Sequence, residues 1–239
     1  MTAAVLAGIA EPRARPDPDD PARVLVMPVV LRIERADPPA RSALLAAAAS
    51  AALAVCLDPR AGVGADGEPG PWHAPVLAWC SGRIRKVSRR ARGAHWAAVG
   101  GLAGVTVEVG GAQARALVPV AVGETAASVR RLQISGTELE PDEPGVAPGG
   151  VPVLWLDARL EMTVGKAAAQ VGHATMLLAA TLGVAELDAW RASGWACAVR
   201  DASPAVFARE LGRPGSVAVR DAGYTEVPAG SVTVVTRWG

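Results

Sequence analysis

The sequence predicts an α/β protein with two similar lobes. Val-rich segments of strand length alternate with Ala-rich segments of helix length along most of the chain. The order of these segments is the same before and after a Pro- and Gly-rich stretch at residues 140–152, which is the clearest linker. The chain has 239 residues and is 51% hydrophobic, which is enough for one large domain or two small ones.

We expect four segments along the chain. Residues 1–22 are rich in Pro, Asp and Arg and are predicted to be a disordered tail. Residues 23–136 are expected to form an N-terminal α/β domain, and residues 137–150 a linker. Residues 151–239 are expected to form a second α/β domain.

In the N-terminal half, the residue types predict each element in turn. Residues 23–33 are a Val-rich strand, and Asp37-Pro38-Pro39 opens a helix that ends near Leu57. Gly and Pro make residues 58–73 a loop. The remaining expected elements are a strand, a turn and a strand over 74–87, a short helix at 93–102, and strands at 104–109 and 114–122.

The C-terminal half repeats this order. A strand at 151–160 precedes a helix from Lys166 to about Gly183. The remaining expected elements are a strand at 195–201, a helix at 203–212, and strands at 216–223 and 230–238.

Residues 85–111 align with residues 197–223 without a gap, at a constant offset of 112. The identical pairs are Val87/Val199, Gly100/Gly212, Val105/Val217, Val107/Val219 and Gly111/Gly223. Matches of this kind are weak evidence in a chain rich in Val and Gly. Together with the shared element order they favour a diverged internal duplication, packed as a pseudo-dimer, over an unrelated α/β domain in the first half.

Composition excludes several classes of protein. The net charge of +1 means that any contact with nucleic acid must come from a local basic patch. The cysteines, Cys56, Cys80 and Cys197, are widely spaced and predict reduced thiols in a cytoplasmic protein. We expect no signal peptide and no membrane span. Metal-ligand spacing and a nucleotide-binding loop are both missing from the sequence, so we expect no metal and no cofactor.

The helix in MTVGKAAAQVGHATM, residues 162–176, carries three polar side chains on one face. Each residue advances about 100° around a helix, so Lys166, Gln170 and His173 point the same way. Each alone would be ordinary, as a solvated lysine or a core histidine, but their common face favours a functional site. Gly165 at the helix start would let an anion approach the free N–H groups. The opposite face should pack on the sheet through Ala167, Val171, Ala174 and Leu178.

A second cluster follows near the end of the chain. Asp221 ends a Val-rich strand, Gly223 forms a turn, Thr225 offers a hydroxyl beyond it, and Thr233 lies on the next strand. Read alone, an Asp before a Gly is often only a turn former.

The two segments resemble the two signatures of type 2 peptidyl-tRNA hydrolases, the archaeal and eukaryotic kind. The first signature, L-x-M-x-x-G-K-x-x-A-Q-x-x-H-A, is matched by Leu160, Met162, Gly165, Lys166, Ala169, Gln170, His173 and Ala174. The second, D-A-G-x-T and a G-[ST]-x-T-V strand, is matched by Asp221, Ala222, Gly223, Thr225, Gly230, Ser231, Thr233 and Val234. The resemblance covers about residues 151–239.

The resemblance implies a mixed four-stranded sheet with helices on both faces, and a protein that is usually a homodimer. It also implies hydrolysis, without a metal, of the ester between a peptide and the 3′ end of tRNA. By match to the signatures, the predicted catalytic residues are Lys166, His173, Asp221 and Thr225, and the predicted substrate-binding residues are Gly165, Gln170 and Thr233.

Two positions depart from the family pattern. Arg159 stands where the family usually has Asp, and Asp157 is close enough to take that place. Glu226 stands where the family favours Gln.

Ester hydrolysis needs an activated water and a stabilised oxyanion. We expect Asp221 to accept the proton of the water, and Lys166 with the helix N–H groups to stabilise the oxyanion or to bind the terminal tRNA phosphate. His173 either orients the acid or braces the helix through a hydrogen bond. The first half carries no such set of residues, so it is expected only to bind or brace.

A basic run at residues 83–92 is the candidate tRNA-binding surface. Contacts of this kind are made to the backbone, are blind to sequence and weaken in salt. The alternative is a solvated edge strand protected by its charge. His95 and Trp96 follow, to stack on a base or to pack in the core. The basic residues are Arg83, Arg85, Lys86, Arg89, Arg90 and Arg92.

The expected partner is therefore peptidyl-tRNA, bound by a monomeric pseudo-dimer or a homodimer. Two alternatives stay open. One is a catalytically weak tRNA- or RNA-binding protein with the same fold, which Arg159 and Glu226 would favour. The other is a small hydrolase of a different ester or amide.

Overall fold

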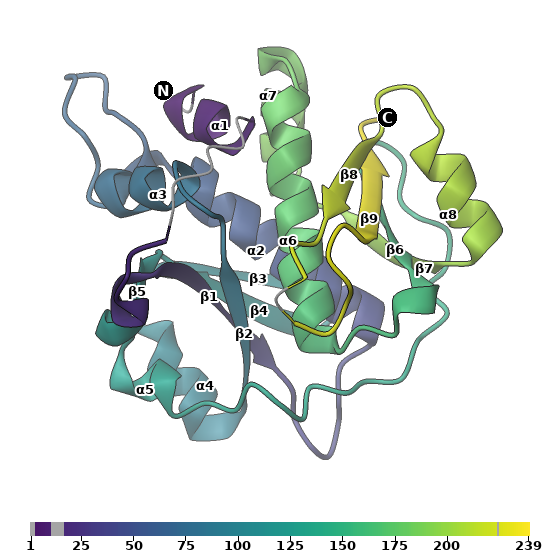
Figure 1. Cartoon of the computed structure of the whole chain (residues 1–239), viewed down its shortest axis with the longest axis horizontal. Coiled ribbons are helices and arrows are strands. Elements are labelled where there is room, and N and C mark those ends of the chain that lie inside the picture. Colours follow the sequence, from purple (N-terminus) through teal and green to yellow (C-terminus); the bar gives the residue numbers. More distant parts are fainter. Residues whose placement is uncertain (1–2, 11–16, 224) are drawn as a thin grey trace.

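Two mixed sheets with the same strand order lie on either side of two long helices (Figure 1). The computed structural model describes residues 3–10, 17–223 and 225–239. The sheets have the orders β2-β1-β4-β3 and β7-β6-β9-β8. In each, the first strand of the lobe pairs in parallel with the second and antiparallel with the fourth. The predicted α/β class, with mixed sheets and two similar lobes, is confirmed.

The N-terminal lobe forms the first sheet and the helices around it. Its strands are β1 (Leu25–Arg32), β2 (Lys86–Ala91), β3 (Gly104–Val109), β4 (Ala112–Leu117) and the short β5 (Val120–Ala121), which pairs with β1. Its helices are α1 (Ala3–Ala10), α2 (Arg41–Leu57), α3 (His73–Cys80), α4 (Gly93–Gly100) and α5 (Ala127–Arg130).

The C-terminal lobe repeats the pattern after the linker. Its strands are β6 (Val153–Asp157), β7 (Ala198–Ala202), β8 (Val217–Arg220) and β9 (Val232–Arg237). Its helices are α6 (Val164–Thr181), α7 (Val184–Ala192) and α8 (Pro204–Leu211).

Helices α2 and α6 pack against each other and join the two lobes into one core. Helix α2 is apolar around its whole circumference, as expected of a helix that is buried on every side. Small residues at the crossing allow close approach, because a Cβ atom placed on Gly172 would lie 3.0 Å from Cβ of Ala52. The outer face of the first sheet is covered by α4 and α5, and that of the second by α8.

Residue rows across the two sheets show how the lobes correspond. The row Val105–Ala116–Val29–Ser88 runs across the first sheet, and Val217–Thr236–Leu154–Val199 runs across the second. Val105 and Val217 keep the predicted offset of 112. At the other end of the rows, Ser88 and Val199 are 111 residues apart, and α4 and α8 also begin 111 residues apart. The gapless alignment therefore slips by one residue between α4 and β3, and the partner of Lys86 is Cys197.

Two short helices differ from the predictions. Residues 74–80 belong to α3 instead of the predicted strand, and α7 lies where no element is predicted. An apolar run of this length does not distinguish a helix from a buried strand. Trp79 on α3 is fully buried and donates its Nε1–H to the carbonyl of Arg85 at 3.0 Å, so tertiary contacts hold this helix.

The predicted disordered tail contains α1, which differs from the prediction. Val5 and Ile9 are buried, and α1 packs against α3 and α6. The apolar start of the chain thus has a surface to pack on that local composition does not reveal. Residues 1–2 and 11–16 of this segment lie outside the described residues.

Residues 137–150 contain no helix or strand but are held to both lobes. Asp142 accepts hydrogen bonds from the backbone N–H of Ser42 at 2.8 Å and from its hydroxyl at 2.6 Å. The three cysteines are unpaired and buried. Among the helices of the described ranges, none has the length and apolar character needed to cross a bilayer.

Candidate active site

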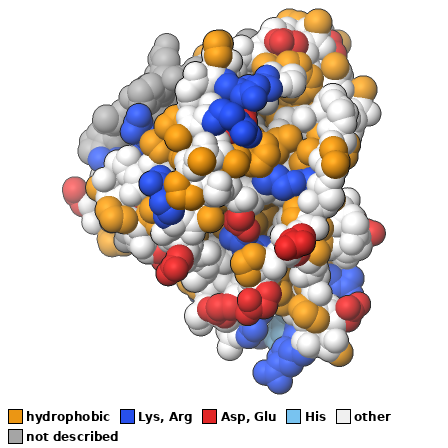
Figure 2. All heavy atoms as spheres, turned by 90° about the vertical axis from the view of Figure 1, so that its right-hand side faces the viewer, with side chains coloured by type: hydrophobic (Ala, Val, Ile, Leu, Met, Phe, Trp, Pro, Cys, Tyr) orange, Lys and Arg blue, Asp and Glu red, His pale blue; other side chains and the backbone are white. Residues whose placement is uncertain are grey.

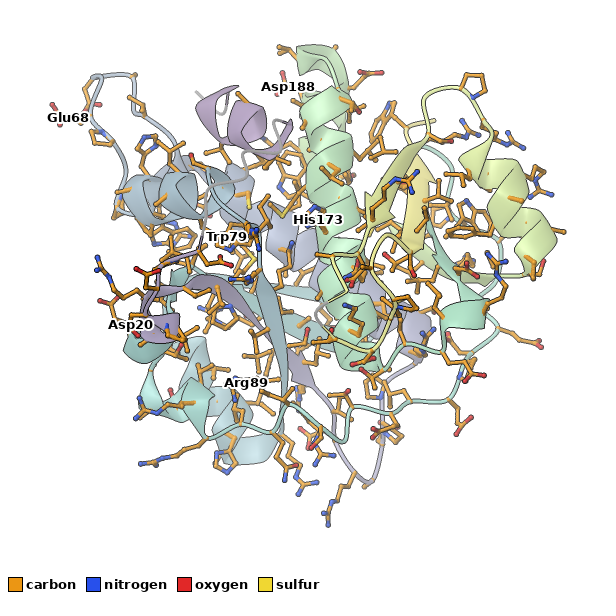
Figure 3. The ribbon with its side chains drawn as sticks, viewed as in Figure 1. Asp20, Glu68, Trp79, Arg89, His173 and Asp188 are labelled. Carbon is orange, nitrogen blue, oxygen red and sulfur yellow. The ribbon has the colours of Figure 1, made fainter. Side chains whose placement is uncertain are left out.

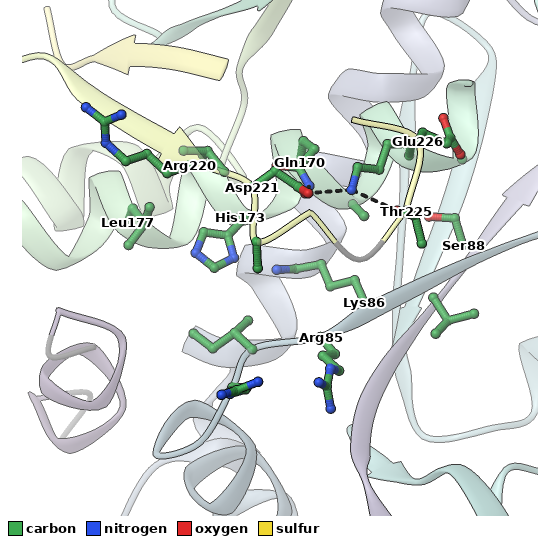
Figure 4. Close-up of a pocket in the computed structure, with 18 of the residues that line it drawn as sticks. Arg85, Lys86, Ser88, Gln170, His173, Leu177, Arg220, Asp221, Thr225 and Glu226 are labelled. Carbon is green, nitrogen blue, oxygen red and sulfur yellow. Dashed lines mark hydrogen bonds and ion pairs between the residues drawn. The ribbon is translucent and has the colours of Figure 1, made fainter. Parts of the chain in front are cut away.

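A cavity of about 1080 Å³ opens between the two lobes (Figure 4). The C-terminal lobe supplies the first half of α6 and residues 218–222, 225 and 226. The N-terminal lobe supplies residues 82–88, which lead into and begin β2, and two residues of α1. The cavity therefore has one wall from each lobe.

The predicted polar residues of the C-terminal lobe meet on one wall. Lys166 Nζ lies 2.5 Å from Oδ2 of Asp221, and both side chains are more than nine-tenths buried. Gln170, one turn after Lys166 on α6, donates its Nε2–H to the same oxygen at 2.8 Å. The backbone N–H of Gly223 donates to the other carboxylate oxygen at 2.8 Å. Three donors from two elements thus fix the orientation of this carboxylate.

The two threonines of the second cluster have different positions. Thr225 Oγ1 accepts a hydrogen bond from Lys166 Nζ at 2.9 Å and lines the cavity. Thr233 is fully buried behind the wall and donates to Oε1 of Gln170 at 2.7 Å. Thr233 therefore sets which way the Gln170 amide points, and it lies away from the cavity in which it was expected to bind substrate.

The start of α6 is closed by protein groups. Thr163 is the N-cap, and its Oγ1 accepts from the N–H of Lys166 at 3.2 Å. Glu226 accepts from the N–H and the hydroxyl of Thr163, both at 2.9 Å. Thr137 accepts from the N–H of Gly165 at 3.2 Å. The expectation that these N–H groups are free for an anion is therefore wrong, although Gly165 does line the cavity.

His173 lines the cavity one turn beyond Gln170, on the face predicted for it. Burial, and then the positive charge of Lys86, lower the pKa of its imidazole to about 3, so it is neutral at pH 7. The helix-bracing hydrogen bond is not found: within the described part of the chain the imidazole has no hydrogen-bond partner.

Lys86 enters the cavity from the opposite wall and points toward His173 (Figure 4). Its Nζ atom is buried and has no hydrogen-bond partner among the described residues, as is also true of Ser88 Oγ. The ring of Trp79 lies 5.2 Å away. Burial lowers the pKa of Lys86 to about 8.

The other basic residues of 83–92 do not form one exposed face. Arg83 and Arg85 line the cavity mouth and pair with Asp17. Arg89 lies far from His173 beside α4 and α5 (Figure 3), where it donates to the carbonyl of Leu132 at 2.8 Å. Arg90 hydrogen-bonds Gln133. The predicted strip is thus divided between the cavity and local structural contacts.

Three further positions from the predictions have clear places. Nη1 of Arg92 is buried. His95 is exposed on α4, and Trp96 packs under the first sheet, as its core interpretation expects. On the face seen in Figure 2, Lys and Arg side chains lie in small groups among Asp and Glu. This view shows no broad surface of one charge.

Asp157 does not stand in for the family carboxylate at position 159. Its carboxylate is paired with the guanidinium of Arg159, whose Nε and Nη2 atoms donate at 2.9 and 2.6 Å. This pairing lowers the pKa of Asp157, and neither residue lines the cavity. The departure at Arg159 is therefore compensated locally, away from the site.

Reasoning from sequence missed three residues that shape the site. Thr163 carries a recognisable signal, because a Thr three residues before Lys166 is a typical N-cap. Ser88 and Thr137 carry none, because their place depends on how the two lobes pack. The cavity continues into a second hollow of about 450 Å³, with which it shares Ile134, Thr163 and Glu226. No group of three or more metal-ligating side chains occurs among the described residues.

Comparison with known proteins agrees with the geometry of the C-terminal lobe. Residues 151–237 match the family model described as peptidyl-tRNA hydrolase PTH2. Neither a curated protein nor a solved structure matches the chain. The matched range contains Lys166, Gln170, His173, Asp221 and Thr225. The C-terminal region, residues 151–237, is therefore a domain of the PTH2 peptidyl-tRNA hydrolase family.

Proposed function

We propose that this protein hydrolyses the ester that joins a peptide to the 3′ end of tRNA, and so returns the tRNA for reuse. The observation that carries the proposal is the ion pair of Lys166 and Asp221 on the wall of a large cavity, inside a domain of this family. The domain covers only the C-terminal lobe. The specific substrate and the role of the N-terminal lobe are part of the proposal.

In the proposed reaction, Asp221 is the base. Its carboxylate is held by Lys166, Gln170 and the N–H of Gly223, and its remaining lone pairs accept a proton from the attacking water. Thr225 accepts from Lys166, which leaves the proton of its own hydroxyl free to be donated to substrate.

Lys166 is the proposed electrostatic catalyst. As the water adds to the ester carbon, negative charge grows on the carbonyl oxygen, and the ammonium group stabilises it. Breaking the ester bond then releases the peptide acid and the 3′-hydroxyl of the tRNA. His173, neutral at pH 7, acts as an uncharged hydrogen-bonding group toward substrate and not as an imidazolium acid. We place the reaction in the cytoplasm, where the reduced state of the buried cysteines is maintained.

A peptidyl-tRNA with a blocked amino end tests the proposal, with release of free tRNA as the readout. We expect turnover by the wild type, and losses of about 10²- to 10⁴-fold in kcat/KM for Asp221→Asn and Lys166→Met. The matched control is Asp188→Asn, which removes an exposed carboxylate on α7.

The second candidate is an RNA-binding protein of the same fold without catalysis. The observation that favours it is Glu226, whose carboxylate replaces the family amide beside the site and is committed to Thr163. Binding of tRNA without release, by the wild type as well as the variants, would establish this alternative and refute the hydrolase. Release that is equal in all variants would move the chemistry to other residues.

A further inference from the structure

The chain contains 24 basic residues, of which only Lys86 and Lys166 are lysines. Both line the same cavity, one on each wall, although they come from different lobes. Arginine supplies every other fixed cation. A lysine offers a compact ammonium on a flexible stem that fits an enclosed position. This placement gives the opposite wall a cation of the same kind as the proposed catalytic one.

The second lobe shows that the fold does not need a cation at this place. Cys197, the partner of Lys86 in β7, is buried against α2, with Sγ 3.7 Å from the carbonyl of Ala46 and 3.6 Å from the hydroxyl of Ser50. Lys86 instead meets α6 at Gly172, where an added Cβ would lie 3.3 Å from Cε of the lysine. Gly172 therefore leaves room for the lysine stem to extend into the cavity.

Two enclosed polar groups on this wall still have hydrogen bonds to give. Lys86 Nζ and Ser88 Oγ, two residues apart on β2, have no hydrogen-bond partner within the described ranges. Residues two apart on a strand face the same side. An ammonium and a hydroxyl that face one cavity are suitable donors for a singly charged anion.

The cavity as a whole favours an anion near this wall. Asp221 is already neutralised by Lys166, and Glu226 is occupied by Thr163. The cationic side chains lining the cavity outnumber these two carboxylates; they are Arg83, Arg85, Lys86, Lys166 and Arg220.

We propose that Lys86 and Ser88 form a subsite for one phosphodiester of the RNA, supplied by the N-terminal lobe opposite the Lys166–Asp221 pair. The proposal rests on the proposed function, because it names where the RNA part of the same substrate binds. The N-terminal lobe then holds the RNA end while the C-terminal lobe cleaves the ester.

A short single-stranded RNA with a free 3′-hydroxyl is the probe, because it carries phosphodiesters but no ester. We expect Lys86→Met to weaken its binding by about 10- to 100-fold, as for loss of one hydrogen bond to a charged group. The slope of log Kd against log salt should fall by about 0.7, which corresponds to one phosphate contact in a single strand. Ser88→Ala should weaken binding less. Arg131→Met, which removes an exposed cation, is the charge-matched control.

Replacing each phosphodiester of the probe in turn by a neutral methylphosphonate locates the contact. We expect one linkage at which the wild type loses affinity while Lys86→Met loses no more. Equal losses in both proteins at every linkage would overturn the proposal. Unchanged RNA binding together with a lower kcat in Lys86→Met would also overturn it, because the lysine would then act on the reacting carbonyl.

The binding assay is independent of hydrolysis. If Asp221→Asn retains the Lys86-dependent contact, a failure of the ester assay refutes the enzyme and leaves the subsite standing. A thermal melt of each variant shows that it is folded. Methionine keeps the unbranched stem beside Gly172, so Lys86→Met should remain folded, and Ser88→Ala tests the same subsite with a smaller change.

Discussion

At the scale of single residues, the site works through the contrast between paired and unpaired polar groups. Asp221, Lys166 and Gln170 satisfy one another, so their geometry is set before substrate arrives. Lys86 and His173 lie nearby without hydrogen-bond partners in the described chain, and burial holds both toward their neutral forms. Groups of the first kind are suited to chemistry and groups of the second kind to contact with a ligand.

The buried imidazole of His173 makes stability depend on pH. Its pKa is about 3 in the folded protein and near 6.5 in the unfolded chain, so between these values the unfolded chain binds the extra proton. Stability should therefore fall as the pH decreases from 6.5 toward 3. The expected loss from this group between pH 7 and pH 5 is about 2 kcal/mol.

Urea unfolding at pH 7 and pH 5 measures this effect. His173→Gln should lose the part of the pH dependence that belongs to the imidazole, while His95→Gln, at an exposed position, should behave as the wild type. The same pH dependence in wild type and His173→Gln would contradict the buried, neutral imidazole.

At the scale of elements, the loop that carries Asp221 and Thr225 is attached to the start of α6. An N-cap N–H is often satisfied by a Glu at the third helical position, but Lys166 occupies that position here. Glu226 replaces it from the neighbouring loop, and its negative charge suits a helix N-terminus. The cap of the helix and the position of the catalytic loop therefore depend on the same carboxylate.

Glu226→Ala should lower the free energy of unfolding by about 1 kcal/mol, as for a lost helix cap. It should also reduce kcat, because the loop that positions Thr225 is released. Glu226→Gln keeps one acceptor oxygen and should retain most of both properties. Chemical denaturation and the tRNA-release assay check these outcomes, with Glu140→Ala in the linker as the control. Full stability and activity of Glu226→Ala would show that the contact does not hold the loop.

The crossing of α2 and α6 gives a second test at this scale. An alanine at Gly172 would press on Ala52 and on the stem of Lys86, so Gly172→Ala should destabilise by about 1–3 kcal/mol. At Gly100, at the end of α4, an added Cβ meets nothing within 4 Å. Gly100→Ala should therefore stabilise by up to about 1 kcal/mol. Thermal or urea unfolding of the two variants should give opposite signs, and a stabilising Gly172→Ala would contradict the close packing.

At the scale of the whole molecule, the two lobes share one hydrophobic core. The cluster includes α2, α6 and strands of both sheets, and Arg41 of one lobe pairs with Asp201 of the other. Neither long helix could leave its partner without exposing apolar surface. The site depends on this arrangement, because one wall of its cavity belongs to each lobe.

We expect the chain to unfold in one cooperative transition. Circular dichroism and tryptophan fluorescence should give coincident melting curves, since both lobes contain buried tryptophans such as Trp79 and Trp190. Arg41→Met should shift both curves together to lower temperature. Two separated transitions, or a shift in one probe alone, would show that the lobes fold independently.

The sequence predicts the architecture well wherever a local pattern decides the structure. The Ala-rich helices and Val-rich strands follow from periodicity, and Lys166, Gln170 and Asp221 follow from the two signatures. Helix α3 and the packing of α1 are missed because contacts distant in sequence decide them. The occupied N–H of Gly165 and the inward position of Lys86 are missed for the same reason: Thr137 and β2 reach α6 only after the lobes have packed.

The pairing of two similar but unequal lobes in one chain has an evolutionary consequence. In a symmetric homodimer, one mutation alters both subunits, so a change that improves one groove is imposed on its mate. Joining the two copies removes that constraint. A lysine at position 86 needs no second lysine at position 197, where the thiol seals the other junction. Covalent fusion thus permits a pocket with unlike walls, which a strictly symmetric pair of identical subunits cannot form at its two equivalent grooves.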